Sequence, residues 1–329
     1  MKIIVDAMGG DHAPAAVIAG VVDAVRESDF HIVLVGIKER VEEELTKYQY
    51  PSDKISIVHA PEVISMHDSA ISSVRKKRNS SITIGMDLLN QKEGRAFVSA
   101  GNTGAMVAAA TFRLGMLNGV DRPGIGLVYP TLEGFSFLMD VGANTDPKPE
   151  HLLQSALMAE VYSKYVMGID NPRVGLLNIG EESSKGTDFV KTTHKLLAEG
   201  MNNFIGNVEP NEIFVGRADC IICDGFVGNV IIKVSQGLME SMSKLLKREI
   251  KKSPFAVIGG LMMRNRLNHV RQIADYSEYG GAPLLGVNGI VMISHGRSSP
   301  KAIKNAIRAT AREVEHNILA KMIEKFGSS

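Results

Sequence analysis

The sequence predicts a three-layer α/β/α fold whose central sheet is largely parallel. Short apolar runs of strand character recur along the 329 residues, and stretches of helical periodicity separate most of them. The runs are continuously apolar rather than alternating, which is typical of parallel strands covered on both faces. Glycine is in excess, with 32 residues in the chain against a usual share of about 7%. These glycines cluster at the ends of the apolar runs.

Three helices are the clearest in the pattern. One is expected over 14–26, one over 149–167 with Pro149 in its first turn, and one over 299–326 after Ser299. The last of these carries one apolar face, made of Ile303, Ile307, Val314, Ile318 and Met322. The expected strands are 3–5, 32–36, 55–58, 96–99, 125–129, 135–141, 174–179, 203–208, 219–223 and 290–294.

The chain is expected to form a single α/β/α domain over 1–329, with a helical hairpin at about 237–276. No repeat or break in composition marks a domain boundary. The hairpin breaks at Ser253-Pro254, and its apolar segment is far shorter than the roughly 20 residues that span a bilayer. Basic residues flank this segment, so it suits either a second subunit or an anionic membrane surface. Its apolar side chains are Phe255, Val257, Ile258, Leu261 and Met262.

Charge, the first residues and the cysteines indicate which partners and which cellular compartment to expect. The formal net charge of +1 predicts no strong global attraction to nucleic acid or to a membrane, so any electrostatic targeting is expected to be local. The first residues run directly into a strand with no leader pattern, so a cytoplasmic location is expected. Cys220 and Cys223 lie three residues apart in an extended run and therefore point to opposite faces, which favours buried structural roles over a metal site.

Glycine-bearing turns between strands and helices are the main candidates for a site. In a parallel sheet they leave the carboxyl edge of the strands and meet in one cleft. Their N–H groups and the helix N-termini suit phosphate, although such folds also need glycine turns for purely structural reasons. The candidates are Gly9, Gly10 and Asp11, then Gly104, Asn144 and Gly225.

Two of these loops carry polar residues of interest. Asn102 and Thr103 precede a helix that is apolar or small all round, so they are either ordinary caps or groups facing an enclosed ligand. Lys185 is expected in the first turn of a helix, where a lysine opposes the helix dipole unless an anion is nearby. An anion-binding role is therefore favoured over a solvated lysine.

His12 and four aspartates follow predicted strands. We expect His12 either to donate to a carbonyl or phosphate oxygen or only to complete a turn. The aspartates suit caps better than a metal, and Asp11 is expected to cap the helix that Pro14 begins. The chain lacks a P-loop, a complete dinucleotide fingerprint and a GxSxG elbow. The aspartates are Asp6, Asp11, Asp140 and Asp224.

Several longer motifs are specific enough to suggest a family. The segments "VDAMGGDHAP", "VRKKRNSS", "SAGNTGA", "MDVGAN", "PRVGLLNIGEE", "NFIGNVE", "DGFVGN" and "YGGAPLLG" occur in that order across nearly the whole chain. Together they resemble the PlsX family of acyl-carrier-protein:phosphate acyltransferases. Met139 stands where that family often has leucine, and 237–276 matches least well.

The resemblance implies a fold related to isocitrate and isopropylmalate dehydrogenases and to phosphotransacetylase, and a homodimer. It implies an enzyme that converts fatty acyl-[acyl-carrier-protein] and inorganic phosphate into acyl phosphate, which feeds phosphatidic acid and phospholipid synthesis. Phosphate is the nucleophile, so no cofactor, metal or serine triad is required. Acyl carrier protein, and a membrane surface or a membrane-bound glycerol-3-phosphate acyltransferase, are the implied partners.

Roles for the residues follow from this reaction. Lys185, Asn102 and Thr103 suit phosphate, Asn144 and Asn229 suit the developing oxyanion, and His12 suits the leaving thiol. The basic run Arg75, Lys76, Lys77 and Arg78 is either a solvated face or a docking site for the acidic carrier. The alternative functions are an NAD-dependent dehydrogenase of the related fold and a membrane-associated scaffold.

Overall fold

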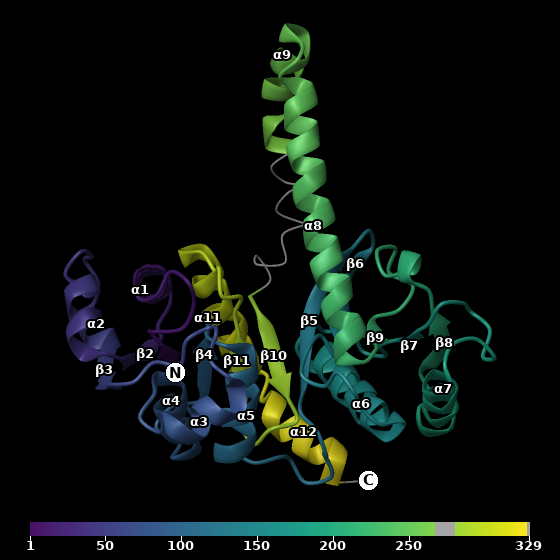
Figure 1. The fold of residues 1–329 in the computed structure, drawn as a ribbon, viewed down its shortest axis with the longest axis horizontal. Coiled ribbons are helices and arrows are strands. Elements are labelled where there is room, and N and C mark those ends of the chain that lie inside the picture. Colours follow the sequence, from purple (N-terminus) through teal and green to yellow (C-terminus); the bar gives the residue numbers. More distant parts are fainter. Residues whose placement is uncertain (267–279, 328–329) are drawn as a thin grey trace.

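The computed structural model describes residues 1–266 and 280–327. Within these ranges one mixed sheet has the strand order β3-β2-β1-β4-β11-β10-β5-β6-β9-β7-β8, and helices cover both of its faces (Figure 1). The strands are β1 Lys2–Asp6, β2 His31–Gly36, β3 Ile55–His59, β4 Ala96–Ser99, β5 Gly124–Thr131, β6 Gly134–Met139, β7 Val174–Leu177, β8 Phe204–Val208, β9 Cys220–Ile222, β10 Ala282–Leu285 and β11 Ile290–Ile293. The helices are α1 Ala15–Glu27, α2 Lys38–Leu45, α3 Ala70–Lys76, α4 Ser81–Asn90, α5 Thr103–Arg113, α6 Pro149–Tyr165, α7 Asp188–Gly200, α8 Gly225–Ile250, α9 Pro254–Met262, α11 Pro300–Glu315 and α12 Ile318–Gly327.

The sheet contains two parallel blocks that run in opposite directions. The N-terminal block comprises β1 to β4 and β11, and the C-terminal block comprises β6 to β9. Three successive antiparallel pairs separate them, namely β11 with β10, β10 with β5, and β5 with β6. Three reversals leave the blocks opposed, so their carboxyl ends lie on opposite edges of the sheet. The prediction of a largely parallel sheet is confirmed, but that of a single carboxyl edge is wrong.

The C-terminal helices bury the face that the sequence predicts. Ile303, Ile307 and Val314 on α11 and Ile318 and Met322 on α12 are all buried. The predicted single helix over 299–326 is nevertheless wrong, because α11 ends at Glu315 and Asn317 has a φ of 51°, in the left-handed region. Asparagine tolerates that conformation, and the chain turns there into α12.

The two cysteines lie on opposite sides of the sheet. Cys220 and Cys223 are both buried and free, and they belong to different apolar clusters. Burial raises the pKa of the Cys220 thiol to about 12. The predicted buried structural role is confirmed.

Helix α8 is the longest of the described helices and leaves the body of the molecule. It begins directly after β9, so it is not confined to the predicted hairpin, and its 26 residues extend about 39 Å. Figure 1 shows it rising beyond the sheet with α9 at its end. The predicted break is confirmed, since Ser253 caps α9 and Pro254 is its first residue. Residues 267–276 of the predicted hairpin lie outside the described ranges.

The apolar segment of this hairpin is short. Over the residues that the structure describes, no helix is both long enough and apolar enough to cross a membrane.

A buried carboxyl lies beneath the helices on one face of the sheet. Tyr162 on α6 donates a hydrogen bond of 3.0 Å to Glu313 on α11, and the Glu313 side chain is almost fully buried. Burial raises the pKa of Glu313 from 4.5 to about 8, which outweighs the opposing effect of the Tyr162 hydroxyl. Glu313 is therefore largely protonated near neutral pH in the folded protein.

We expect Glu313→Gln to flatten the dependence of the unfolding free energy on pH. A folded-state pKa above the unfolded value stabilises the protein fully below pH 4.5, and this stability is lost as pH rises towards 8. Between those pH values the free energy of unfolding should fall by about 1.4 kcal/mol per pH unit because of this group. Urea unfolding at several pH values measures the slope. Tyr162→Phe, which keeps the carboxyl, should retain it, and an unchanged slope in Glu313→Gln would contradict the assignment.

Candidate functional site

The predicted site residues fall into two groups at opposite edges of the sheet. The His12 edge comprises the loops after β1, β4 and β11, and the Lys185 edge comprises the loops after β6, β7 and β9. His12, Gly9, Gly10, Asp11, Asn102, Thr103 and Gly104 belong to the first group. Asn144, Lys185, Gly225 and Asn229 belong to the second. The expectation that all these loops leave one edge fails because β10, β5 and β6 reverse the strand direction.

At the His12 edge, tight packing fixes the first glycine loop. Buried Asp6 accepts a hydrogen bond of 2.7 Å from the Ser99 hydroxyl, and a Cβ on Gly9 would lie 2.5 Å from the same carboxylate. Burial raises the pKa of Asp6, although nearby hydroxyls and N–H groups oppose the shift. Gly10 has a φ of +101°, where other residues are strained. This loop therefore requires its glycines for structural reasons.

The next two residues of this loop are exposed. His12 faces solvent, so its role in proton transfer stays a prediction. Asp11 donates its backbone N–H to Gly296 and lies 3.9 Å from the Arg297 side chain. The predicted capping by Asp11 is wrong, because Pro14 occupies the N-cap of α1 and no side chain caps that helix.

The Asn102 side chain is a cap and a loop anchor. Its oxygen accepts a hydrogen bond of 3.0 Å from the Ala105 N–H, and its amide nitrogen donates to the carbonyls of Ser65, Met66 and Asp68. The amide hydrogens are committed to these carbonyls, so the Asn102 side chain positions a loop, and its contact with phosphate stays a prediction. The exposed Thr103 and Gly104 begin α5, where backbone N–H groups lack partners within the helix.

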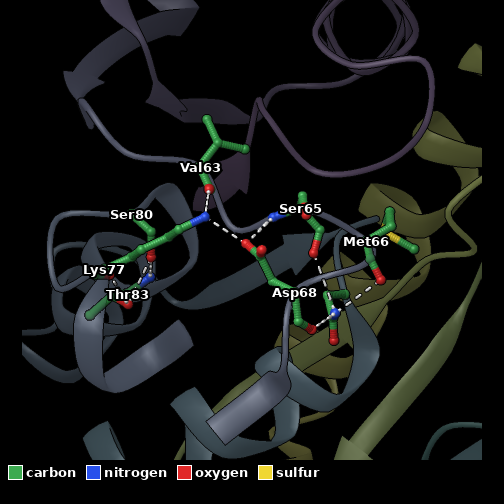
Figure 2. Close-up of polar contacts among 8 residues, drawn as sticks. Val63, Ser65, Met66, Asp68, Lys77, Ser80 and Thr83 are labelled. Atoms are coloured by element: carbon green, nitrogen blue, oxygen red, sulfur yellow. Dashed lines mark hydrogen bonds and ion pairs between the residues drawn. The ribbon is translucent and has the colours of Figure 1, made fainter. Parts of the chain in front are cut away.

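The basic run at 75–78 contains one lysine with a structural role. Figure 2 shows Lys77 reaching inward to the Val63 carbonyl and to Asp68, at 2.8 and 2.5 Å. Lys77 holds the pKa of the Asp68 carboxyl below its ordinary value. Because Asp68 also anchors the loop that Asn102 contacts, Lys77 belongs to that scaffold. The other three members, Arg75, Lys76 and Arg78, are exposed.

Asp140 organises the Lys185 edge. Its buried carboxylate accepts five hydrogen bonds, from the N–H groups of Ile125, Gly142, Ala143 and Asn144 and from the Asn144 amide. Burial raises the pKa of Asp140, and these donors oppose the shift. The five bonds join the start of β5 to the loop after β6.

Helix α8 is pressed against this loop at its first turn. The Gly225 N–H donates to the Asn144 carbonyl at 2.7 Å, and a Cβ on Gly228 would lie 1.9 Å from the Asp140 carbonyl. The Asn144 amide donates to Asp140 and to the Pro123 carbonyl. The Gly225 N–H and the Asn144 amide, which the sequence analysis assigned to ligand binding, therefore make hydrogen bonds that hold α8 and its neighbouring loop in place.

The Lys185 loop lies between β7 and α7. Lys185 is exposed and precedes the helix, so its predicted place in the first turn is wrong; Thr187 is the cap. The Asn178 amide donates to the Lys185 carbonyl at 3.2 Å. Gly186 has a φ of +85°, and a Cβ there would lie 2.6 Å from the Asn178 oxygen. The backbone that carries Lys185 is therefore fixed while its ammonium group faces solvent.

Helix α8 connects the two edges. Asn229 and Lys233 are four residues apart and share a face of this helix. At the His12 edge, burial lowers the pKa of His295, and the charges of Arg297 and Lys233 lower it further. Lys233 therefore lies near the loop after β11. Sequence reasoning missed Lys233, His295 and Arg297, although the spacing of Lys233 from Asn229 was a usable signal.

The fold is of the α/β class, and its candidate site lies in the loops and helix N-termini at strand ends. Helix N-termini, a fixed exposed lysine and glycine-shaped loops suit a phosphate-bearing ligand. The family model of the fatty acid synthesis protein matches residues 1–321. The chain belongs to this family, the PlsX family of phosphate acyltransferases, as the motif resemblance predicts, and it is a transferase.

Curated relatives span the whole chain. A phosphate acyltransferase of Geotalea uraniireducens is 49% identical over 325 residues, covering 99% of this chain and 94% of the relative. One of Alkaliphilus oremlandii is 45% identical over 328 residues, covering 100% and 98%.

Solved structures share the fold at low identity. A phosphotransacetylase from Streptococcus pyogenes has a TM-score of 0.62 at 18% identity, over 96% of this chain and 94% of that one. A branched-chain phosphotransacylase from Enterococcus faecalis has a TM-score of 0.58 at 12% identity, over 96% and 100%. The predicted relation to the phosphotransacetylase fold is confirmed.

Proposed function

We propose that this enzyme transfers the acyl group of a fatty acyl-[acyl-carrier-protein] to inorganic phosphate at the Lys185 edge. The observation that carries the proposal is the meeting of anion donors with an apolar pocket. Lys185 and the N-termini of α7 and α8 adjoin a cavity of about 450 Å³ lined mainly by apolar side chains. Acyl transfer to phosphate requires both kinds of surface side by side.

Lys185 supplies the charge in this arrangement. Two acidic neighbours have cations of their own, since Glu181 pairs with Arg217 and Asp188 lies 3.7 Å from Lys191. The ammonium group of Lys185 and the first-turn N–H groups of α7 then act on a bound phosphate. Holding phosphate beside the thioester converts a bimolecular attack into a positioned one.

The reaction needs no external acid in its overall balance. A phosphate oxygen bonds to the carbonyl carbon, and negative charge develops on the carbonyl oxygen. The Asn229 amide stabilises that charge, because the first N–H groups of α8 are already bonded to Asn144 and Asp224. The C–S bond then breaks, and the proton lost by hydrogen phosphate is the one gained by the leaving sulfur. Because His12 lies at the opposite edge of the sheet, the phosphate itself delivers this proton to sulfur in the proposed reaction.

We expect thiol release from an acyl-carrier donor to require phosphate and Lys185. Lys185→Ala should lower kcat/KM for phosphate about a hundredfold, because a charged donor to the transition state is lost. Lys195→Ala, an exposed change further along α7, should match the native enzyme. Thiol release is followed with a chromogenic reagent, with and without phosphate. Phosphate-independent release by the native protein would refute the transferase proposal.

The donor carrier is proposed to dock on α3 and the end of α5. Arg75, Lys76 and Arg78 are exposed there, and Arg75 lies 5.4 Å from the ring centre of Phe112, which is half exposed. A surface that mixes basic and apolar groups suits an acidic carrier. Helix α5 starts at the His12 edge and returns across the sheet, so its last turn points towards the Lys185 edge.

Reversing charge on this surface should raise the KM for acyl-carrier donors by roughly tenfold. The variant combines Arg75→Glu, Lys76→Glu and Arg78→Glu and leaves Lys77 intact, because Lys77 anchors Asp68. A small acyl thioester, which needs no docking, should react as with native enzyme. Lys195→Glu is the control. Equal losses with both donors would argue against docking here.

The exposed stripe of α8 is proposed to be covered by a second copy of this chain, and α9 to rest on a membrane surface or a membrane-bound acyltransferase that uses acyl phosphate. The stripe on α8 repeats at helical spacing and consists of the exposed side chains Val234, Leu238, Met242 and Leu245. On α9, Phe255 and Met262 are more than four-fifths exposed.

This stripe should make the protein a dimer, because apolar area of that extent is normally covered. Leu238→Glu combined with Met242→Glu should shift it to monomer. Sedimentation analysis measures both states, and a native monomer at micromolar concentration would exclude the dimer.

A further inference from the structure

A largely apolar pocket lies directly beneath the Lys185 loop. Its volume is about 450 Å³, within the range of small-molecule sites. It opens between the N-terminal turns of α7 and α8, and the buried Cys223 contributes to its wall. The apolar lining includes Leu152, Leu176, Phe189, Val190 and Val227.

The polar groups of the lining already have partners. Asn178 accepts from the Ile179 N–H at 2.8 Å and donates to the Lys185 carbonyl. Asp224 accepts from the N–H groups of Phe226 and Val227, both at 2.9 Å. A ligand rich in amides would lose its own hydrogen bonds on entering this pocket. A hydrocarbon chain loses none, so the lining favours an alkyl group over the pantetheine arm of the donor.

The mouth of the pocket continues the apolar surface. Ile179 is 78% exposed and Phe226 is 61% exposed, although both are large apolar residues. Ile179 belongs to the lining, and Phe226 precedes Val227 on α8. An alkyl chain that runs past them buries apolar area that the protein otherwise leaves in water.

We propose that this pocket binds the hydrocarbon chain of the acyl donor and selects donors by chain length. The inference rests on the proposed function, because it places the thioester carbonyl beside Lys185 at the pocket mouth. Asn178 links the two parts, since it lines the pocket and holds the Lys185 backbone. Each methylene that enters raises kcat/KM about fourfold until the pocket is full.

Val227→Phe tests this proposal by filling the pocket from α8. Rates of acyl phosphate formation are measured with small thioesters from acetyl to palmitoyl. The substitution should lower kcat/KM for long chains by roughly tenfold or more and leave acetyl transfer within about twofold. Val190→Phe, from α7, should act likewise. Val215→Phe, an exposed valine outside the lining, is the control. Equal losses for all chain lengths, or none, would overturn the proposal.

Direct binding separates this inference from the proposed function. Calorimetry with decanoate should show binding to the native protein and to Val215→Phe, and a loss of roughly tenfold or more in Val227→Phe. If no thioester yields acyl phosphate but this pattern holds, the transferase proposal fails and the alkyl pocket stands. Decanoate binding that is absent, or unchanged in Val227→Phe, would refute the pocket.

Discussion

The buried carboxylate of Asp140 is the interaction on which the candidate site depends. Its five hydrogen bonds fix the loop after β6 against the start of β5. That loop receives the first N–H of α8, and Gly228 leaves no room between the helix and the Asp140 carbonyl. These contacts therefore fix the direction of α8 at the same edge of the sheet as Lys185 and the pocket.

The reversal of strand direction makes α8 a link between the two edges of the sheet. Because β10, β5 and β6 turn the C-terminal block over, the two sets of glycine loops lie on opposite edges. Helix α8 begins at one edge and brings Lys233 near His295 at the other. We infer that the Lys185 edge handles acyl transfer and that α8 joins it to the His12 edge.

Much of the fold and the family follow from local sequence. Buried faces such as that of Ile303 and Ile307, and the break at Ser253-Pro254, are visible in periodicity and capping residues. The direction of each strand is not visible, because a continuously apolar run indicates burial on both faces of the sheet and not which way the strand points. The committed amides of Asn102 and Asn144 also escape such reasoning, since their carbonyl partners include residues more than twenty positions away. Lys77 differs from Lys76 through its bonds to Val63 and Asp68, which local sequence patterns do not reveal.

Phosphate titration followed by amide resonances tests most directly which edge performs the chemistry. Inorganic phosphate is added to nitrogen-15-labelled native protein, and the shifts are mapped on the two sets of loops. The account predicts the largest shifts in residues 180–189 and 225–229, with little change in 9–12, 101–104 and 295–298. Largest shifts in the second set, with none around Lys185, would contradict it.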